Sequence, residues 1–350
     1  MSTHDAARVG SESPVLVTGA TGFIGQHCIA ALLERGHRVR GTVRKAERAN
    51  AVRDVLSKHV DVSRLEFAVT DLDHDAGWDN ALRGCRHVMH VASPLPTRPP
   101  KHEDDVIIPA REGTLRVLRA ARDAGTKRVV LTSSLSAVIF TKNRSERTHS
   151  EEDWSDDERL GAYDKSKTFA ERAAWDFARS TGGSLELVAI NPGLVLGPLL
   201  GRDTSASAEV VRRLLAREVP ASPRIGWAVA DVRDVAEAHV AAMFTPEAAN
   251  QRFCCATGHA WMPDIASILH QHFGPRGFRV PTRTLPDVVM RAMALFDPSL
   301  RMVVHKLGRR VDVSTEKIMR ILQWRPRSIR HAVVDMGESL IAHRLVSASV

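Results

Sequence analysis

The sequence has few cysteines, the residue that forms disulfide bonds and many zinc sites. Its 350 residues include four cysteines, and none of them forms a Cys-x-x-Cys pair. Neither a zinc ligand set nor a disulfide framework is predicted from this spacing. A reduced, cytoplasmic setting is therefore the default expectation. The four are Cys28, Cys85, Cys254 and Cys255.

Long hydrophobic runs are also absent. No apolar run is long enough to cross a bilayer, so no membrane association is expected. Residues 1–13 are polar and lack the apolar core of a secretory signal. We expect them to form a flexible tail before the first strand.

The chain is basic, but it has no block of basic residues. The net charge is +8, with 49 lysines and arginines spread along the sequence among 41 acids. This pattern fits an anionic cofactor or substrate better than a nucleic acid. A metal site is not expected either, because His87 and His90 lie three residues apart on a predicted strand and so face opposite sides.

Tyrosine is the scarcest residue that bears on chemistry. The chain has one, Tyr163, and it lies four residues before Lys167. On a helix this spacing puts both side chains on one face, where an ammonium is expected to lower the pKa of the phenol. The phenol would then suit general acid catalysis. The spacing alone also occurs on ordinary exposed helices, so its meaning depends on the rest of the chain.

The first half of the sequence alternates strand and helix patterns, which predicts an α/β fold with a doubly wound parallel sheet. A smaller C-terminal lobe with short helices is expected to follow. We predict a tail over 1–13, a Rossmann domain over 14–190, and a mainly substrate-binding lobe over 191–345, partly interleaved with it. Strands are predicted at 15–17, 38–43, 65–69, 87–91, 128–131 and 187–190. Helices are predicted at 23–35, 46–58, 78–83, 104–123, 207–217, 232–243, 262–273 and 285–295, with a further helix carrying Tyr163.

A glycine-rich segment, Thr18-Gly-Ala-Thr-Gly-Phe-Ile-Gly25, directly follows the first predicted strand and opens the first helix. Gly19 suits the tight turn, Gly22 lets the backbone approach a pyrophosphate, and Gly25 allows close packing of helix on strand. Free N–H groups at the helix start would hold the phosphates. The segment therefore predicts a dinucleotide site.

The end of the second predicted strand indicates which dinucleotide is bound. An NAD site has an acid there to hold the ribose hydroxyls, but this strand ends in Arg44. The planar guanidinium pairs well with phosphate oxygens, which favours NADP. The alternative is that Arg44 points into solvent. A second basic residue for the 2′-phosphate would be Arg48 or Arg53.

Together these elements resemble the extended short-chain dehydrogenase/reductase superfamily from Val15 to about Leu340. Within it, the chain is most similar to the dihydroflavonol reductase and cinnamoyl-CoA reductase branch, which includes bacterial aldehyde and ketone reductases. Further motifs that carry the resemblance are Asp71-Leu72, His90-Val-Ala-Ser-Pro94, Thr132-Ser-Ser134, Glu152-Asp-Trp-Ser155, Asn191-Pro-Gly-Leu-Val195 and Asp231-Val-Arg-Asp-Val-Ala236.

The resemblance implies roles for individual residues. Tyr163 would protonate the carbonyl oxygen, Lys167 would lower the phenol pKa and bind the nicotinamide ribose, and Ser134 would hydrogen-bond the substrate. Ser134 is preferred to Ser133 because the family's catalytic serine ends this run. The residues expected to contact NADPH are Gly19, Thr21, Gly22, Phe23, Ile24, Gly25, Arg44, Asp71, Leu72, Val91, Ala92, Ser93, Tyr163, Lys167, Pro192 and Val195.

The expected substrate pocket departs from that of the plant flavonoid reductases. These carry an asparagine that helps to hold the flavonoid, and Ile139 stands at the matching position, which argues for a more apolar pocket. The residues expected to line it are Leu95, Leu135, Ile139, Gly193, Leu199 and Trp227.

The function predicted from these patterns is NADPH-dependent reduction of a small-to-medium aldehyde or ketone by a monomer or homodimer. A nucleotide-sugar epimerase, a steroid-type dehydrogenase and a non-catalytic dinucleotide sensor remain as alternatives. A sensor would be expected to lack the Tyr163–Lys167 pair.

Overall fold

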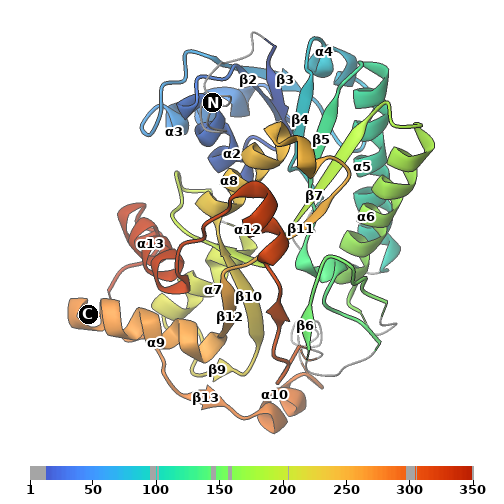
Figure 1. Cartoon of the computed structure of the whole chain (residues 1–350). Coiled ribbons are helices and arrows are strands. Elements are labelled where there is room, and N and C mark those ends of the chain that lie inside the picture. Colours follow the sequence, from blue (N-terminus) through green and yellow to red (C-terminus); the bar gives the residue numbers. More distant parts are fainter. Residues whose placement is uncertain are drawn as a thin grey trace.

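Seven parallel strands form the central sheet of the protein (Figure 1). The computed structural model describes residues 13–94, 100, 102–142, 147–156, 160–203, 205–296, 304 and 306–348. The strand order is β11-β7-β5-β4-β1-β2-β3, and every neighbouring pair is parallel. The strands are β1 (Val15–Val17), β2 (Val39–Val43), β3 (Leu65–Val69), β4 (His87–His90), β5 (Arg128–Thr132), β7 (Glu186–Pro192) and β11 (Arg252–Cys255).

In the central strands of the sheet, alternate side chains enter two separate hydrophobic cores, as the two-residue period of a strand requires. Val15 and Val17 of β1 pack in one core, and Leu16 between them packs in the other. The first core is shared with α2 (Phe23–Glu34), α3 (Glu47–Leu56), α8 (Val232–Phe244) and α12 (Glu316–Leu322). The second core is shared with α4 (Trp78–Leu82), α5 (Asp104–Asp123) and α6 (Ala162–Ser180). Helices therefore cover both faces, and the predicted doubly wound Rossmann-type fold is confirmed.

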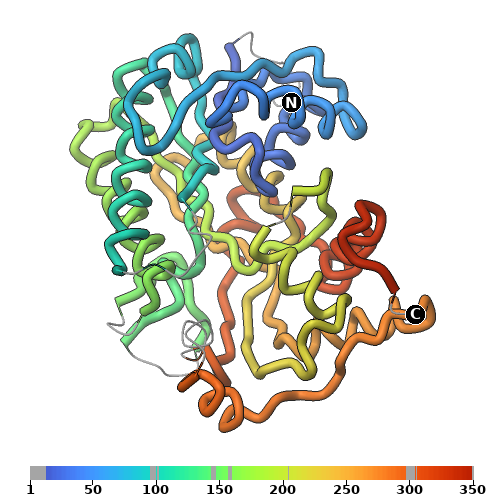
Figure 2. Tube along the Cα trace, turned by 180° about the vertical axis from the view of Figure 1, so that it is seen from behind, coloured from blue at the N-terminus to red at the C-terminus, as the bar shows by residue number. Residues whose placement is uncertain are grey.

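A second, smaller sheet follows the main one. Its order is β12-β10-β8, where β8 (Leu194–Leu196) is parallel to β10 (Gly226–Asp231) and β12 (Gly258–Trp261) is antiparallel to it. Three helices share a hydrophobic core with this sheet: α7 (Ala206–Leu215), α9 (Met262–Phe273) and α13 (Ile329–Ala342). Figure 2 shows this part of the chain from behind, below the blue N-terminal segment.

Short elements complete the described chain. The strand pairs are β9 (Ser222–Pro223) with β13 (Thr284–Leu285), and β6 (Thr148–His149) with β14 (Asp312–Val313). A single turn of 3-10 helix, η1, spans Leu135–Ala137, and α10 spans Asp287–Met293. None of the described helices is both long and apolar enough to span a membrane. The predicted tail lies outside the described residues, apart from Ser13.

Several elements of the fold differ from the sequence-based expectation, which included no strand at β8, β10 or β12 and no helix at α12 or α13. Strand β11 was not predicted, and it returns the chain to the edge of the main sheet after the smaller sheet has begun. The helix predicted over 285–295 is shorter, because Thr284 and Leu285 pair with β9 and the helix starts at Asp287.

Candidate active site

The turn between β1 and α2 forms one wall of a large cavity. Gly19 has φ +73, which a residue with a side chain rarely adopts, and a Cβ there would lie 3.1 Å from Ala92. A Cβ on Gly25 would lie 2.2 Å from the carbonyl oxygen of Gly19, so glycine is required for this packing. The backbone N–H of Gly22 donates to the same carbonyl at 2.9 Å.

The start of α2 fits a bound anion. Gly22, its N-cap, has no side chain to cap the helix, and the first turn carries no acidic residue. The N–H groups and the partial positive charge of the helix end therefore face the cavity without a competing carboxylate on the helix. These observations fit the pyrophosphate of a dinucleotide.

The next strand brings Arg44 to the same cavity. Arg44 follows the last residue of β2, is exposed, and lines the cavity. The two candidates for a second phosphate ligand are engaged elsewhere. Arg48 pairs with Asp203 at 2.5 Å, and Arg53 donates to the carbonyls of Val62 at 3.2 Å and Leu65 at 2.7 Å. Neither of them lines the cavity.

The cavity has a volume of about 1070 Å³. All sixteen residues expected to contact the cofactor line it, from Gly19 to Val195, including Asp71, Leu72 and the loop after β4. That loop is held against the glycine turn, because the N–H of Ala92 donates to the hydroxyl of Thr18 at 2.9 Å. The roles of the individual residues remain predictions, but the structure does place them around one space.

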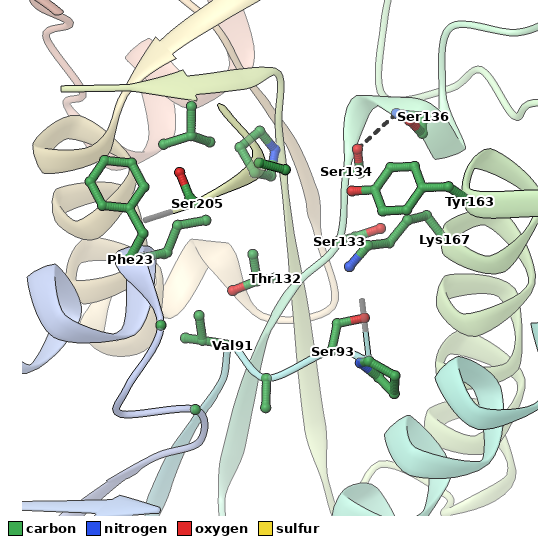
Figure 3. A pocket seen from close by; sticks show the side chains of 18 of the residues that line it. Phe23, Val91, Ser93, Thr132, Ser133, Ser134, Ser136, Tyr163, Lys167 and Ser205 are labelled. Atoms are coloured by element: carbon green, nitrogen blue, oxygen red, sulfur yellow. Dashed lines mark hydrogen bonds between the residues drawn. The ribbon is translucent and has the colours of Figure 1, made fainter. Parts of the chain in front are cut away.

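Ser134, Tyr163 and Lys167 converge on the same cavity from two elements (Figure 3). Ser134 follows β5 and caps η1, where its hydroxyl accepts a hydrogen bond from the N–H of Ser136 at 3.1 Å. Tyr163 and Lys167 lie in the first turns of α6, with the ammonium 5.9 Å from the centre of the phenol ring. In Figure 3 the phenol oxygen points toward the Ser134 hydroxyl.

Ser133 is turned to a different partner. Its hydroxyl donates to the buried carboxylate of Glu171 at 2.5 Å. This geometry leaves Ser134 as the serine that faces the phenol and favours the choice made from the motif.

The ionisation of the tyrosine and lysine differs from the expectation. Tyr163 exposes 37% of its surface, yet the surrounding protein still desolvates the phenol oxygen. Burial, and then the Asp164 carboxylate, raise the pKa of Tyr163 to about 12, while the Ser134 hydroxyl lowers it. Burial also lowers the pKa of Lys167 to about 8, although the Glu171 carboxylate raises it. The expected lowering of the phenol pKa is wrong, because burial of the phenol and the nearby Asp164 carboxylate both raise it.

Four of the six residues expected in the substrate pocket line the cavity: Leu135, Ile139, Gly193 and Trp227. Leu199 does not. It is 4% exposed and packs in the core of the smaller sheet, because the loop that carries it lies against α7, α9 and α13. Leu95 lies outside the described residues.

The cavity also has walls that the sequence did not indicate. Lys306, Arg309 and Val311 line it from a segment far along the chain, and Phe140 lines it beside Ile139. Lys306 lies 5.5 Å and Arg309 4.8 Å from the centre of the Phe140 ring. No motif marks these residues, so only the tertiary structure could have found them. The start of α7 contributes Ser205, Ala206, Ser207 and Val210.

Comparison with known proteins agrees with this geometry. Residues 15–256 match the model of the NAD dependent epimerase/dehydratase family. The chain belongs to this family. It is 36% identical over 276 residues to cinnamoyl-CoA reductase 1 of Petunia hybrida, covering 77% of this chain and 79% of that protein. It is 32% identical over 273 residues to dihydroflavonol 4-reductase of Hordeum vulgare, covering 75% and 76%.

Solved structures give the same assignment. The yeast methylglyoxal/isovaleraldehyde reductase Gre2, complexed with NADPH, superposes with a TM-score of 0.79 at 26% identity, covering 95% of this chain and 99% of that chain. Gre2 of Candida albicans in complex with NADPH gives a TM-score of 0.78 at 25% identity, covering 94% and 99%. The predicted superfamily and its reductase branch are confirmed, and the chain is an oxidoreductase of the extended short-chain type.

Proposed function

We propose that this oxidoreductase uses NADPH to reduce the carbonyl group of a small-to-medium, partly apolar aldehyde or ketone, with Tyr163 as the general acid. The observation that carries the proposal is the placement of Tyr163 and Ser134 in the cavity that the glycine turn and Arg44 also line. One space can therefore hold a dinucleotide and a second small molecule. The reverse oxidation of the alcohol uses the same groups.

The cofactor preference follows from Arg44. The guanidinium lies at the end of β2, where this fold holds the ribose of the dinucleotide. Arg44 stands at the position where an NAD site would have an acidic residue. Two similar structures, the Gre2 reductases, are complexes with NADPH. Both observations support NADPH over NADH.

The residues divide the chemistry as follows. Bound NADPH supplies the hydride. Tyr163 is protonated at neutral pH, since its pKa is raised to about 12, so it can donate its proton to the carbonyl oxygen as negative charge develops there. The Ser134 hydroxyl faces the phenol and can donate to the same oxygen, and Lys167 stabilises the phenolate that remains.

The walls around Tyr163 support an apolar carbonyl compound. Leu135, Ile139, Phe140, Trp227 and Val311 line the cavity with hydrocarbon surface. Ile139 cannot hydrogen-bond a flavonoid hydroxyl. Among similar proteins, the yeast enzyme is named for methylglyoxal and isovaleraldehyde, and the Petunia enzyme for a cinnamoyl thioester.

The test is the loss of reduced-nicotinamide absorbance with NADPH and NADH in parallel. The panel includes isovaleraldehyde, methylglyoxal, cinnamaldehyde and simple ketones. We expect consumption of NADPH well above that of NADH. Tyr163→Phe should reduce turnover by about 10²-fold or more, the usual contribution of a general acid, while NADPH binding is retained.

Two results would contradict the proposal. Unchanged turnover in Tyr163→Phe would show that Tyr163 is not the general acid. A wild-type protein that consumes neither cofactor and releases tightly bound NAD on denaturation would indicate an epimerase instead.

A further inference from the structure

A buried carboxylate lies one helical turn beyond Lys167. The Glu171 side chain has no exposed surface, and four side chains donate hydrogen bonds to it. One oxygen accepts from Ser133 at 2.5 Å and Asn191 at 2.6 Å. The other accepts from Trp175 at 3.1 Å and Arg252 at 2.6 Å. A buried carboxylate with this many partners is fixed in position.

The partners of Glu171 belong to the strands that end at the active site. Ser133 directly follows β5 and precedes Ser134, and Asn191 lies near the end of β7. Asn191 also donates to the backbone carbonyl of Ser134 at 3.1 Å. Hydrogen bonds therefore run from α6, which carries Tyr163, to the peptide that carries the catalytic serine.

Arg252 extends this network to the wall of the substrate pocket. Its guanidinium donates to the carbonyls of Glu151 at 2.8 Å and Asp153 at 2.9 Å, and lies 3.7 Å from the centre of the Trp154 ring. The same segment continues to Ser155, whose hydroxyl accepts from the N–H of Phe140 at 2.9 Å. The Glu152-Asp-Trp-Ser155 motif, which the proposed chemistry does not use, thus connects Glu171 to the pocket.

The charge of Glu171 also acts on Lys167. The two residues are four apart on α6, a spacing that puts their Cβ atoms about 6 Å apart. The other titratable groups around Lys167 are Tyr163 on its own helix and His90 of β4, whose burial keeps it neutral. Arg252 of β11 faces Glu171 directly, with Glu151 and Lys317 of α12 beyond it.

We propose that Glu171 is the positioning residue of this active site: its buried carboxylate holds Ser134 and the end of β7 in register with α6 and keeps the Lys167 ammonium charged. The inference rests on the proposed reductase function. Glu171 does not line the cavity, so its effect reaches the chemistry through Lys167, Ser133 and Asn191.

The first variant is Glu171→Gln, which keeps the shape and removes the charge. We expect the alkaline limb of kcat/KM for NADPH to move down by about one pH unit, the lower end of the effect of a nearby opposite charge. With isovaleraldehyde as the probe, kcat at about pH 8 should fall roughly 10- to 100-fold, as for misplaced catalytic groups. Part of this loss should be recovered at about pH 6, where Lys167 is protonated again.

The control is Glu186→Gln. Glu186 pairs with Arg128 at 2.6 Å, in a partly buried pair at the opposite end of β7. This variant loses a carboxylate–arginine pair of the same kind, so it should lose stability without moving the alkaline limb. A merely structural role for Glu171 would give the same pH-independent result as this control.

A second pair of variants is Ser133→Ala and Ser133→Thr, for the case in which Glu171→Gln does not fold. Loss of the hydroxyl should lower kcat with little change in KM for the aldehyde, and threonine should restore the rate. If Glu171→Gln keeps the wild-type limb and kcat, or if Ser133→Ala matches wild type, the proposal is wrong.

The dissociation constant of NADPH, measured by fluorescence at the same pH values, separates this inference from the proposed function. As the pH increases, the dissociation constant of NADPH should begin to rise at a lower pH in Glu171→Gln than in wild type. This shift is expected even if none of the aldehydes is reduced. An inactive wild-type protein with this shift would retain the inference and reject the reductase function. If the enzyme is active but the pH dependence of its NADPH dissociation constant is the same in Glu171→Gln and wild type, the reductase function is retained and the inference is rejected.

Discussion

Replacement of Arg44 by alanine should weaken NADPH binding and leave NADH binding unchanged. Arg44 lines the cavity at the end of β2, and no hydrogen-bond or ion-pair partner engages it among the described residues. Its guanidinium is therefore available to a phosphate on the adenine ribose. NADH has no such phosphate, so it gains nothing from this side chain.

The size of the effect follows from the exposure of Arg44. A hydrogen bond to a charged group contributes about 1.5–3 kcal/mol, and an exposed site takes the lower end of that range. Since about 1.4 kcal/mol corresponds to a factor of ten, the dissociation constant of NADPH should rise about tenfold. The NADPH-to-NADH affinity ratio should fall by the same factor.

The assay is fluorescence titration of each reduced cofactor into wild type, Arg44→Ala and Arg48→Ala. Arg48 is the matched control, because it lies on the next helix, pairs with Asp203 at 2.5 Å and does not line the cavity. Its replacement should leave the ratio unchanged. An equal loss of affinity for both cofactors in Arg44→Ala, or a drop in the ratio for Arg48→Ala, would refute the reasoning.

Three further predictions concern packing and ionisation. Gly25→Ala should abolish NADPH binding, measured by calorimetry, and lower the free energy of unfolding by about 1–3 kcal/mol, because the new Cβ would lie 2.2 Å from the Gly19 carbonyl oxygen. The control is Gly274→Ala, whose Cβ would lie 3.7 Å from its nearest neighbour and which should be tolerated. The value of kcat/KM for NADPH should fall as the pH rises through about 8, where Lys167 loses its proton while Tyr163 keeps its own; a limb near the ordinary lysine value would contradict this. The free energy of unfolding should fall as the pH drops below about 6.5, by up to ~1.4 kcal/mol per pH unit for each buried histidine with a lowered pKa, because the unfolded chain takes up the protons first. Urea denaturation between neutral pH and about pH 4 tests this, and a flat profile would contradict it. The buried histidines with a lowered pKa include His27, His90 and His239.

The sequence predicts well those parts of the fold whose determinants are local. The turn from β1 into α2 depends on glycines within eight residues, and the structure shows the close contacts that require them. Helices α8 and α9 start at Val232 and Met262, as predicted, because Asp231 supplies an N-cap acceptor and Pro263 suits a first turn. The strands of the first half follow from runs of buried apolar residues.

Two short strands that the sequence did not predict, β11 and β8, depend on distant partners. Strand β11 has four residues, and its place is set by pairing with β7 about sixty positions earlier in the chain. Strand β8 has three residues and depends on β10 in the same way. Segments this short carry too little periodicity to identify, so tertiary contacts decide their conformation.

The pKa values show a second limit of prediction from sequence. The four-residue spacing of Tyr163 and Lys167 indicates their proximity correctly, and the ammonium does lie 5.9 Å from the ring. The direction of the phenol shift depends on how deeply both groups are buried, which spacing does not reveal. Desolvation disfavours both the phenolate and the ammonium, and it is the largest cause of both pKa shifts.

This balance explains why a further carboxylate is needed below Lys167. The pKa of Lys167 lies near 8 with the Glu171 carboxylate in place, so without that negative charge the buried ammonium would be charged over less of the neutral range. Glu171 is the group that raises that pKa, and its own burial is compensated by four hydrogen bonds, from Ser133 after β5 and from residues of β7, α6 and β11. The strands that position the serine thus also stabilise the charge that the lysine requires. Changes in this network should therefore alter geometry and pH dependence together, whereas changes in Arg44 should alter cofactor choice alone.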